Sequence, residues 1–383
     1  MIIAAGFLVI LLMLNGFSQS MRRLNLYDYI FILFCIWRVA SCAWSLYPHL
    51  SVLTVKTDVI PSILGYLLVR IGIPLACVPV VTLLKSLILS CLAAMLLRTL
   101  YLLWPDYFYF SWLSTQVIDI VMFGTLLAAI APVLLCGWVF RGMPAFQFGW
   151  ARKDWIVLFL AHYVASGLLF SRILELAFAV MVIFCGTLLY LYDRPRFYSN
   201  RLMLFVGAVF YFVGMVFVID IRNEYFQYGN ILWDTFSKTE RWIIYSNWIR
   251  FFLDFGHWYG WGLGWGGPAG VVGHLGLLPK GLPTLWFSHG HNVFLNALLQ
   301  TGYPGVALLL VFIFGSALRF ARQITLNVPA ATFGLLILGV FVIKNGPDDG
   351  ARGAVFTCFV MLIALAHSLL DASGRDAVRP VEG

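Results

Sequence analysis

The sequence predicts an all-α polytopic membrane protein with about 11 transmembrane helices, in a range of about 10 to 12, and one large external loop. Composition is the first reason: of 383 residues, 62% are hydrophobic and 11% are charged, and the mean hydropathy is +0.91. These values exclude an ordinary water-soluble globule. The second reason is that apolar runs near the roughly 20 residues needed to cross a hydrocarbon core recur along the chain. The third is the distribution of cations among the loops.

The apolar runs give the expected order of the spans. They lie at about 1–17, 29–47, 62–82, 85–104, 117–139, 155–171, 173–192, 202–220, 293–318, 328–344 and 352–370. The first run lacks a basic n-region and a small-residue cleavage site, and Arg22 and Arg23 follow it. We therefore expect a helix there and not a cleaved signal peptide.

An external N-terminus places most cations on the cytoplasmic side. The cytoplasmic segments then hold Arg22, Arg23, Lys85, Arg141, Arg152, Lys153, Arg194, Arg196, Arg201, Arg319, Arg322, Arg375 and Arg379. The short external loops hold only Lys56, Arg172, Lys344 and Arg352. This asymmetry satisfies the positive-inside rule, which counts short loops.

We treat residues 1–383 as one membrane domain, because no internal repeat is visible and the cytoplasmic tail, 371–383, is too short to fold alone. The external loop covers 221–290. Inside it, a capping-box pattern ends at Glu240. A helix is expected to follow and to stop at Gly256, with an apolar stripe of Trp242, Tyr245, Ile249, Phe252 and Phe255. Such an amphipathic helix is anchored at the membrane interface or packed on the spans.

A glycine-rich stretch follows this helix. Ten glycines lie between Gly256 and Pro283, including Gly260, Gly262 and Gly264. This density lets the main chain approach a ligand closely and is compatible with an anion-binding nest of backbone N–H groups. A tight loop pinned by aromatic side chains is the structural alternative.

Two histidines, His289 and His291, stand at the mouth of the next span. A metal site is one interpretation, but no third ligand lies at a supporting spacing. A general base or a hydrogen-bond partner for a sugar hydroxyl fits a near-neutral imidazole at least as well. Asn292 is the expected N-cap of a helix over 293–318, which either protrudes from the membrane or breaks at residues 302–305.

Several arginines occupy positions where an anion would be a favourable partner. Arg172 must lie at the external end of a tight helical hairpin, where it pairs with Glu175 or binds an anion. Arg241 lies in the first turn of the loop helix, where a basic side chain is slightly unfavourable for the helix itself. Two interpretations of Arg241 stay open: an ordinary surface arginine, or a ligand for a phosphate group. Arg38, Arg70 and Arg98 lie inside predicted spans, and we expect them to snorkel to outer-leaflet phosphates.

Three motifs together resemble the O-antigen ligase and polymerase family of bacterial inner-membrane glycan transferases. Arg172 is followed by Leu176, similar to an Arg-x-x-x-Leu element of the family. Arg241 precedes the glycine motif, and His291-Asn292 precedes Gly302-x-x-Gly305, similar to the family's His-Asn signature. The resemblance is clear over roughly residues 155–320.

The resemblance implies transfer of a glycan from undecaprenyl diphosphate to a hydroxyl at the periplasmic face of the bacterial inner membrane, with no cofactor and no metal. Arg172 and Arg241 are then expected to meet the diphosphate charge, since the sequence has no DxD cluster to hold Mg²⁺. His291 is expected to take the acceptor proton. Substrate contacts are expected from His289, Asn292, Gly262, Gly264 and Arg352.

The expected partners are the lipid-linked glycan donor, lipid A core or a growing glycan as acceptor, membrane lipids and a chain-length regulator, but no nucleic acid. A ligase is favoured slightly, because a single large external loop follows the eighth span. A repeat-unit polymerase for O-antigen, capsule or exopolysaccharide stays open, because the donor chemistry is shared. A lipid-linked sugar flippase is the alternative of another class, although it predicts inverted repeats. A metal-dependent hydrolase that uses His289 and His291 is a further one.

Overall fold

The computed structural model describes residues 24–72, 79–103, 120–167, 172–226, 240–275, 292–346 and 353–376. Within these ranges the chain is helical and contains no β-strand. Seven described helices are long and apolar enough to cross a membrane. The prediction of an all-α membrane protein is therefore confirmed at this level.

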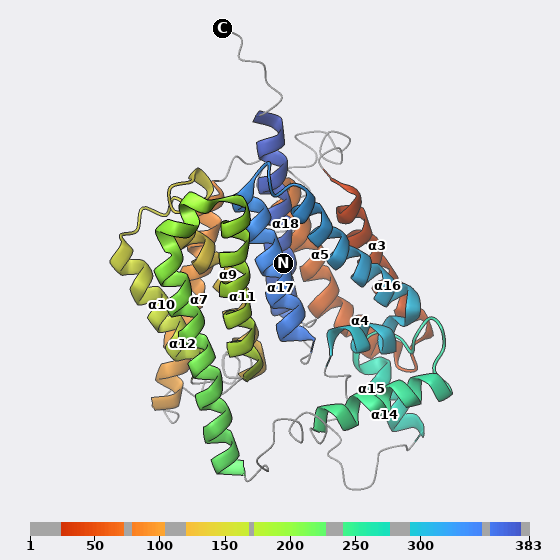
Figure 1. The fold of residues 1–383 in the computed structure, drawn as a ribbon. Coiled ribbons are helices and arrows are strands. Elements are labelled where there is room, and N and C mark those ends of the chain that lie inside the picture. The colour runs from red at the N-terminus through yellow and green to blue at the C-terminus, as the bar shows by residue number, and fades with distance from the viewer. Residues whose placement is uncertain are drawn as a thin grey trace. The chain divides into compact units, whose positions relative to one another are not determined.

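Contacts divide the chain into two compact units, which we describe one at a time (Figure 1). The first unit draws on Met1–Ile71, Tyr228–Leu318 and Asn345–Met361. It contains α3 (Leu26–Ala40), α4 (Pro48–Thr54), α5 (Ile60–Leu67), α14 (Glu240–Phe255), α15 (Pro268–Leu275), most of α16 (Val293–Arg322) and the start of α18 (Gly353–Asp376). Short turns η1 (Ser41–Trp44), η2 (Val55–Val59), η3 (Leu68–Gly72) and η5 (Gly264–Gly266) join them. In Figure 1, α14 and α15 lie beside α4 and the beginning of α16.

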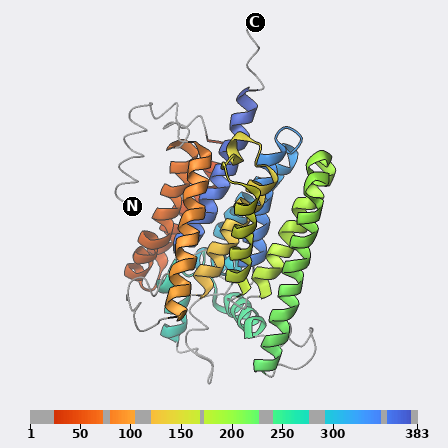
Figure 2. The same cartoon turned by 90° about the vertical axis from the view of Figure 1, so that its left-hand side faces the viewer.

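The second unit draws on Gly72–Gln227, Arg319–Lys344 and Leu362–Gly383. It contains α7 (Val80–Leu103), α9 (Ile120–Val139), η4 (Pro144–Phe146), α10 (Arg152–Gly167), α11 (Arg172–Tyr192), α12 (Arg194–Phe226), most of α17 (Val328–Asn345) and the rest of α18. The long green helix α12 packs along α11 (Figure 2). It continues to Phe226, six residues into the predicted external loop.

The predicted spans agree only partly with the described helices. The seven candidates are Leu26–Trp44, Pro48–Gly72, Val80–Leu97, Ile173–Tyr192, Arg194–Gly214, Val293–Arg322 and Val328–Asn345. Shorter apolar helices, Phe123–Val139 and Phe356–Ala372, lie where two further spans were predicted. Helix α10 corresponds to the predicted span at 155–171. The span at 1–17 lies outside the described residues, so the total number of spans stays a prediction.

The span predicted at 62–82 is misplaced. A continuous helical run already begins at Pro48 and ends at Gly72. The sequence misleads because Pro61 cannot donate a backbone hydrogen bond and normally interrupts a helix. Here the ladder widens to a π-turn just before it, and the N–H of Ile60 bonds to the carbonyl of Val55. The widened turn absorbs the irregularity, and Lys56, predicted in a loop, lies within this helical run.

A buried ion pair ties α3 to the end of the Pro48–Gly72 run. The Arg70 guanidinium donates to both carboxylate oxygens of Asp28, at 2.9 and 2.7 Å. The Tyr66 hydroxyl donates to the same carboxylate at 2.6 Å, and the Asn25 backbone N–H does so at 2.6 Å. Asp28 and Arg70 are 0% and 2% exposed. The prediction that Arg70 snorkels to lipid phosphates is therefore wrong, because its charge is met inside the protein.

Candidate functional site

The start of α16, in the first unit, is fixed by the cap that the sequence predicts. The Asn292 side-chain oxygen accepts hydrogen bonds from the backbone N–H groups of Phe294 and Leu295, each at 2.9 Å. This is the geometry of an N-cap, in which a side chain satisfies donors that the first helical turn leaves free. The prediction for Asn292 as a cap is confirmed. His289 and His291 lie outside the described residues.

Helix α16 is broken at Gly302, where φ is 67° and ψ is −166°. Of the two arrangements that the sequence left open, the break is the one observed. In an unbroken helix, the N–H of Tyr303 would bond to the carbonyl of Leu299, and an N–H at position 304 would bond to the carbonyl of Gln300. Tyr303 instead donates to a loop carbonyl at 2.9 Å, and Pro304 has no N–H to give. Two helix carbonyls are thereby left without their normal donors.

The glycine-rich segment supplies the missing donors. The N–H of Trp261 donates to the carbonyl of Leu299 at 2.9 Å, and the N–H of Gly262 donates to that of Gln300 at 2.9 Å. The segment therefore closes the gap in α16 in the way that a neighbouring strand would. The Gly262 N–H is engaged in this bond, so it does not contribute to a nest of free donors. The predicted substrate contacts of Gly262 and Gly264 stay predictions.

On its other side, the segment is held by Ser45, in the turn that joins α3 to α4, and by Ser51, inside α4. The Ser51 hydroxyl donates to the carbonyl of Leu263 at 2.6 Å, and the Ser45 hydroxyl donates to that of Gly266. Gly262 has φ 102°, and a Cβ there would lie 2.6 Å from the Cβ of Ser45. Glycine is needed because the backbone is left-handed and the approach is closer than any side chain allows.

Replacing Gly262 with alanine is expected to lower the free energy of unfolding by about 2–5 kcal/mol, since left-handed strain and overpacking add. Thermal unfolding of the purified protein, followed by fluorescence, measures the effect. Gly339→Ala is the matched control: a Cβ at this α17 position meets no atom within 4 Å. The control is expected to be neutral or slightly stabilising. Equal thermal stability of the two variants would contradict the bracing role of the segment.

The helix predicted to follow Glu240 and to stop at Gly256 is found as α14, which ends at Phe255. Its buried face differs from the predicted stripe. Ile244, Trp248 and Phe252 are buried, whereas Ile249 and Phe255 are 47% and 56% exposed. The buried face joins one hydrophobic cluster with Trp261, Val271, Val272, Leu295 and Leu299. The helix thus packs on the glycine segment and on the first turns of α16, an arrangement that its own periodicity does not reveal.

The two predicted catalytic arginines occupy helix starts. Arg241 is the second residue of α14, in its first turn as predicted, and belongs to the first unit. Arg172 is the first residue of α11 and belongs to the second unit. The side chains of both arginines lie outside the part of the chain that the structure describes. Glu175, the partner suggested for Arg172, is 1% exposed, and its carboxylate makes no hydrogen bond in the described part of the chain.

Arg38 is a functional candidate that the sequence analysis assigned only to snorkelling. Its side chain is 5% exposed and therefore does not snorkel to the membrane surface as predicted. The guanidinium lies over the rings of Phe34 and Phe356, 5.6 and 6.0 Å from their centroids. One guanidinium nitrogen, Nη1, is buried and has no hydrogen-bond partner in the part of the chain that the structure describes, and no described carboxylate lies within 4.0 Å. Arg70, in the same unit, is paired with Asp28. Of the two buried arginines, only Arg38 lacks a carboxylate partner among the described residues.

Asn345 is a second buried polar group of the first unit with unmet hydrogen bonds. It ends α17 and is 0% exposed, and neither its side-chain oxygen nor its nitrogen has a hydrogen-bond partner among the described residues. Buried amides are normally satisfied, so such a residue is a candidate ligand contact. The segment that follows it contains the predicted substrate residue Arg352, which lies outside the described residues. In the sequence, Arg38 can be recognised as a charged residue within an apolar span. Nothing in the sequence marks Asn345.

Comparison of the sequence with models of known protein families and with proteins of established function finds no match.

Proposed function

We propose that the protein transfers a glycan from undecaprenyl diphosphate to an acceptor hydroxyl at the periplasmic face of the bacterial inner membrane, as an O-antigen ligase type of transferase. The observation that carries the proposal is the buried guanidinium of Arg38, which makes no ion pair with the described residues and whose Nη1 has no hydrogen-bond partner among them. A buried charge without a counter-charge is costly. An anionic substrate that reaches it, such as a lipid diphosphate, offsets that cost.

The chemistry follows from the charges that change during transfer. The acceptor oxygen forms a bond to the anomeric carbon, and the bond from that carbon to the diphosphate oxygen breaks. Negative charge therefore grows on the leaving diphosphate, and guanidinium groups stabilise it because they bind phosphate oxygens bidentately. We assign this role to Arg38 and the predicted Arg241, both of the first unit. The role predicted for Arg172, in the second unit, stays a prediction. No metal is required in this scheme.

The acceptor side of the reaction is assigned to His291. A neutral imidazole accepts the proton of the attacking hydroxyl and raises its nucleophilicity. The cap formed by Asn292 supports the assignment, because it fixes the first turn of the helix that follows directly. The broken helix and its glycine brace stiffen the same end of α16. Inversion at the anomeric carbon is the expected stereochemical outcome of a single displacement.

The test of the proposal is product analysis with the purified full-length protein in proteoliposomes. Undecaprenyl-diphosphate-linked repeat units are supplied first alone and then with lipid A core. Donor consumption only after lipid A core is added is the expected result for a ligase. A ladder of lengthening lipid-linked glycans without lipid A core would instead establish the polymerase alternative. Inertness in both settings, with donor crossing the bilayer, would establish a transporter and overturn the proposal.

A further inference from the structure

Helix α16 is longer than a membrane span requires. It runs from Val293 to Arg322, and 30 residues make about 45 Å of helix at 1.5 Å per residue. The hydrocarbon core of a bilayer is only about 30 Å thick. A tilt of about 20°, the average for such helices, lengthens the path by only about 2 Å. One end of the helix must therefore extend about 10–15 Å beyond the core.

The surplus lies at the start of the helix. The part before the break carries three buried polar side chains, those of Asn296, Gln300 and Thr301. The part after the break is entirely apolar over residues 306–315 and ends in a basic turn that contains Arg322. From Tyr303 to Arg322 the helix rises about 28 Å, which matches the hydrocarbon core. The break at Gly302 therefore coincides with the membrane surface opposite to Arg322.

Helix α3 runs antiparallel to α16 and reaches the same level. Phe31, near the start of α3, packs on Phe312 with ring centroids 4.9 Å apart. The indole N–H of Trp37, near the end of α3, donates to the carbonyl of Thr301 at 2.8 Å. The candidate span that begins with α3 ends at Trp44. A second span therefore ends beside the break in α16.

The turn that carries Trp258 is fixed at this level. The Trp258 carbonyl accepts from the N–H of Tyr303 at 2.9 Å, and a Cβ on Gly302 would lie only 2.2 Å from its oxygen. The next residue, Tyr259, packs edge-to-face on Trp44 with ring centroids 5.4 Å apart. The turn thus lies against the ends of both spans, and the position of Trp258 is set by the backbone of α16.

Two aromatic side chains at this level are exposed. Trp258 is 62% exposed and Tyr303 is 53% exposed. Tyr303 also begins a stripe of exposed residues that recurs at helical spacing along α16 and continues through Ala307, Val311, Phe314 and Leu318. This stripe is apolar and lies on a candidate membrane span, so hydrocarbon is the medium that it faces. Tyr303 stands where that hydrocarbon ends.

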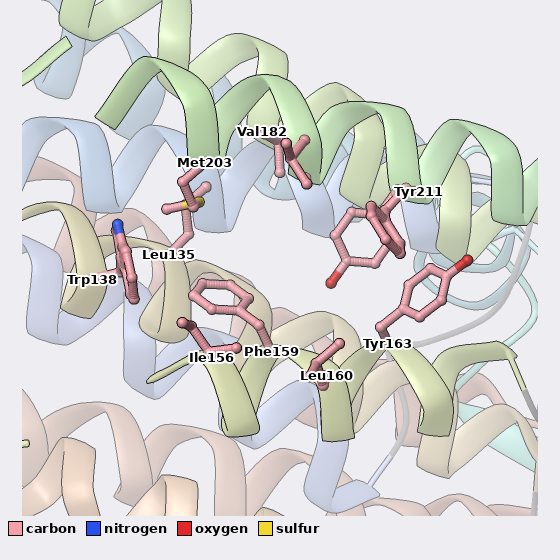
Figure 3. A pocket seen from close by; sticks show the side chains of 12 residues that line it. Leu135, Trp138, Ile156, Phe159, Leu160, Tyr163, Val182, Met203 and Tyr211 are labelled. Carbon is pink, nitrogen blue, oxygen red and sulfur yellow. The ribbon is translucent and has the colours of Figure 1, made fainter. Parts of the chain in front are cut away.

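The second unit has an exposed apolar surface of a different kind. A groove of about 200 Å³ is lined by side chains of α9, α10, α11 and α12, with Trp138 at one end and Tyr163 and Tyr211 at the other (Figure 3). Its lining is apolar almost throughout, so the lining alone does not select an occupant. The exposed face of α16 differs, because it changes from aliphatic to amphipathic aromatic side chains at one defined level.

We propose that Trp258 and Tyr303 form an anchor for the phospholipid surface of the leaflet opposite to Arg322. The two rings lie at the level of the head groups, where tryptophan and tyrosine are favoured because an apolar ring carries a polar tip. The indole N–H and the phenol hydroxyl donate to phosphate or ester oxygens. The anchor holds the break of α16 at the membrane surface, with the capped start of the helix outside the hydrocarbon. It does not depend on the proposed transferase activity.

The test uses the full-length protein in phospholipid nanodiscs and two phospholipid probes. One probe carries a diazirine on its head group, and the other carries it at the end of an acyl chain. Labelled residues are located by mass spectrometry after illumination. The head-group probe is expected to prefer Trp258 and Tyr303. The chain-end probe is expected to prefer Val311 and Phe314, because they lie midway between Tyr303 and Arg322, at the centre of the bilayer.

Two results would overturn the proposal. Labelling of Trp258 by a water-soluble diazirine and by neither lipid probe would show an aqueous surface, open to a sugar or a second protein. A preference of Trp258 for the chain-end probe would place the break inside the hydrocarbon.

The anchoring role has a matched pair of variants. Trp258→Ser is expected to reduce labelling of Tyr303 by the head-group probe, and Trp258→Tyr is expected to restore it. Leu253→Ser is the control, since Leu253 lies in α14 of the same unit and is 69% exposed. It is expected to leave the label on Tyr303 unchanged. No loss in Trp258→Ser, or an equal loss in Leu253→Ser, would contradict the anchor.

Discussion

Asp28→Ala is expected to lower the free energy of unfolding by about 3–5 kcal/mol, because it strips a buried guanidinium of its carboxylate. Asp28 accepts two hydrogen bonds from Arg70 and one from Tyr66, and all three side chains are at most 2% exposed. The same carboxylate completes the capping box at the start of α3. Its removal therefore affects the packing of α3 and the helix end together.

The ion pair contributes less to the free energy of unfolding than is lost when only one of its partners is removed. Replacing both partners with apolar residues, as in Asp28→Leu with Arg70→Met, is expected to recover most of the lost stability, because no buried charge then remains. Asp193→Ala is the control, since Asp193 pairs with Arg196 near the surface and such pairs are worth about 0–1 kcal/mol. SDS titration of the protein in mixed micelles measures all variants. A loss for Asp28→Ala no larger than for Asp193→Ala would contradict this assignment.

Arg38→Gln is expected to weaken binding of undecaprenyl diphosphate by about 10- to 100-fold, the value of one charge-assisted hydrogen bond. The fold should be preserved, because Arg38 forms no ion pair with the described residues and contributes mainly its stacking on Phe34 and Phe356. Arg38→Lys should restore affinity only in part, since a lysine keeps the charge but loses the bidentate fork.

Native mass spectrometry with added lipid measures this binding. Undecaprenol, which has the same chain and no phosphate, should bind the Arg38→Gln variant as well as it binds the unmodified protein. The control substitution is Arg250→Gln, at an arginine of α14 that is 87% exposed. Unchanged affinity for the diphosphate in Arg38→Gln, or an equal loss for undecaprenol, would exclude Arg38 as the group that meets the charge.

Local signals in the sequence predict the ends of several elements correctly. The Asn292 cap and the stop at Gly256 each depend on the chemistry of one residue, and both are found. The break near Gly302 is one of the two arrangements that the sequence left open. The start of α11 at Arg172 likewise follows from a short polar interruption between two apolar runs. Where a helix end is determined by residues that are neighbours in the chain, the sequence is sufficient to predict it.

Features that depend on distant segments are the ones the sequence misses. The pairing of Arg70 with Asp28 and the burial of Arg38 under Phe356 join residues that are far apart in the chain. Helix periodicity cannot say that the glycine segment repairs the break in α16, because this needs the carbonyls freed around Gly302. The run from Pro48 to Gly72 was missed because a π-turn offsets a proline that usually ends a helix.

Release of undecaprenyl diphosphate by the purified protein tests the proposed transferase activity most directly. Proteoliposomes receive the lipid-linked donor, an acceptor glycan or lipid A core, and a chelator, and the released lipid is quantified by mass spectrometry. We expect release that persists in the chelator and falls by about 100-fold or more in His291→Ala, the scale of a lost general base. Release that requires a divalent metal, or that is unchanged in His291→Ala, would contradict it.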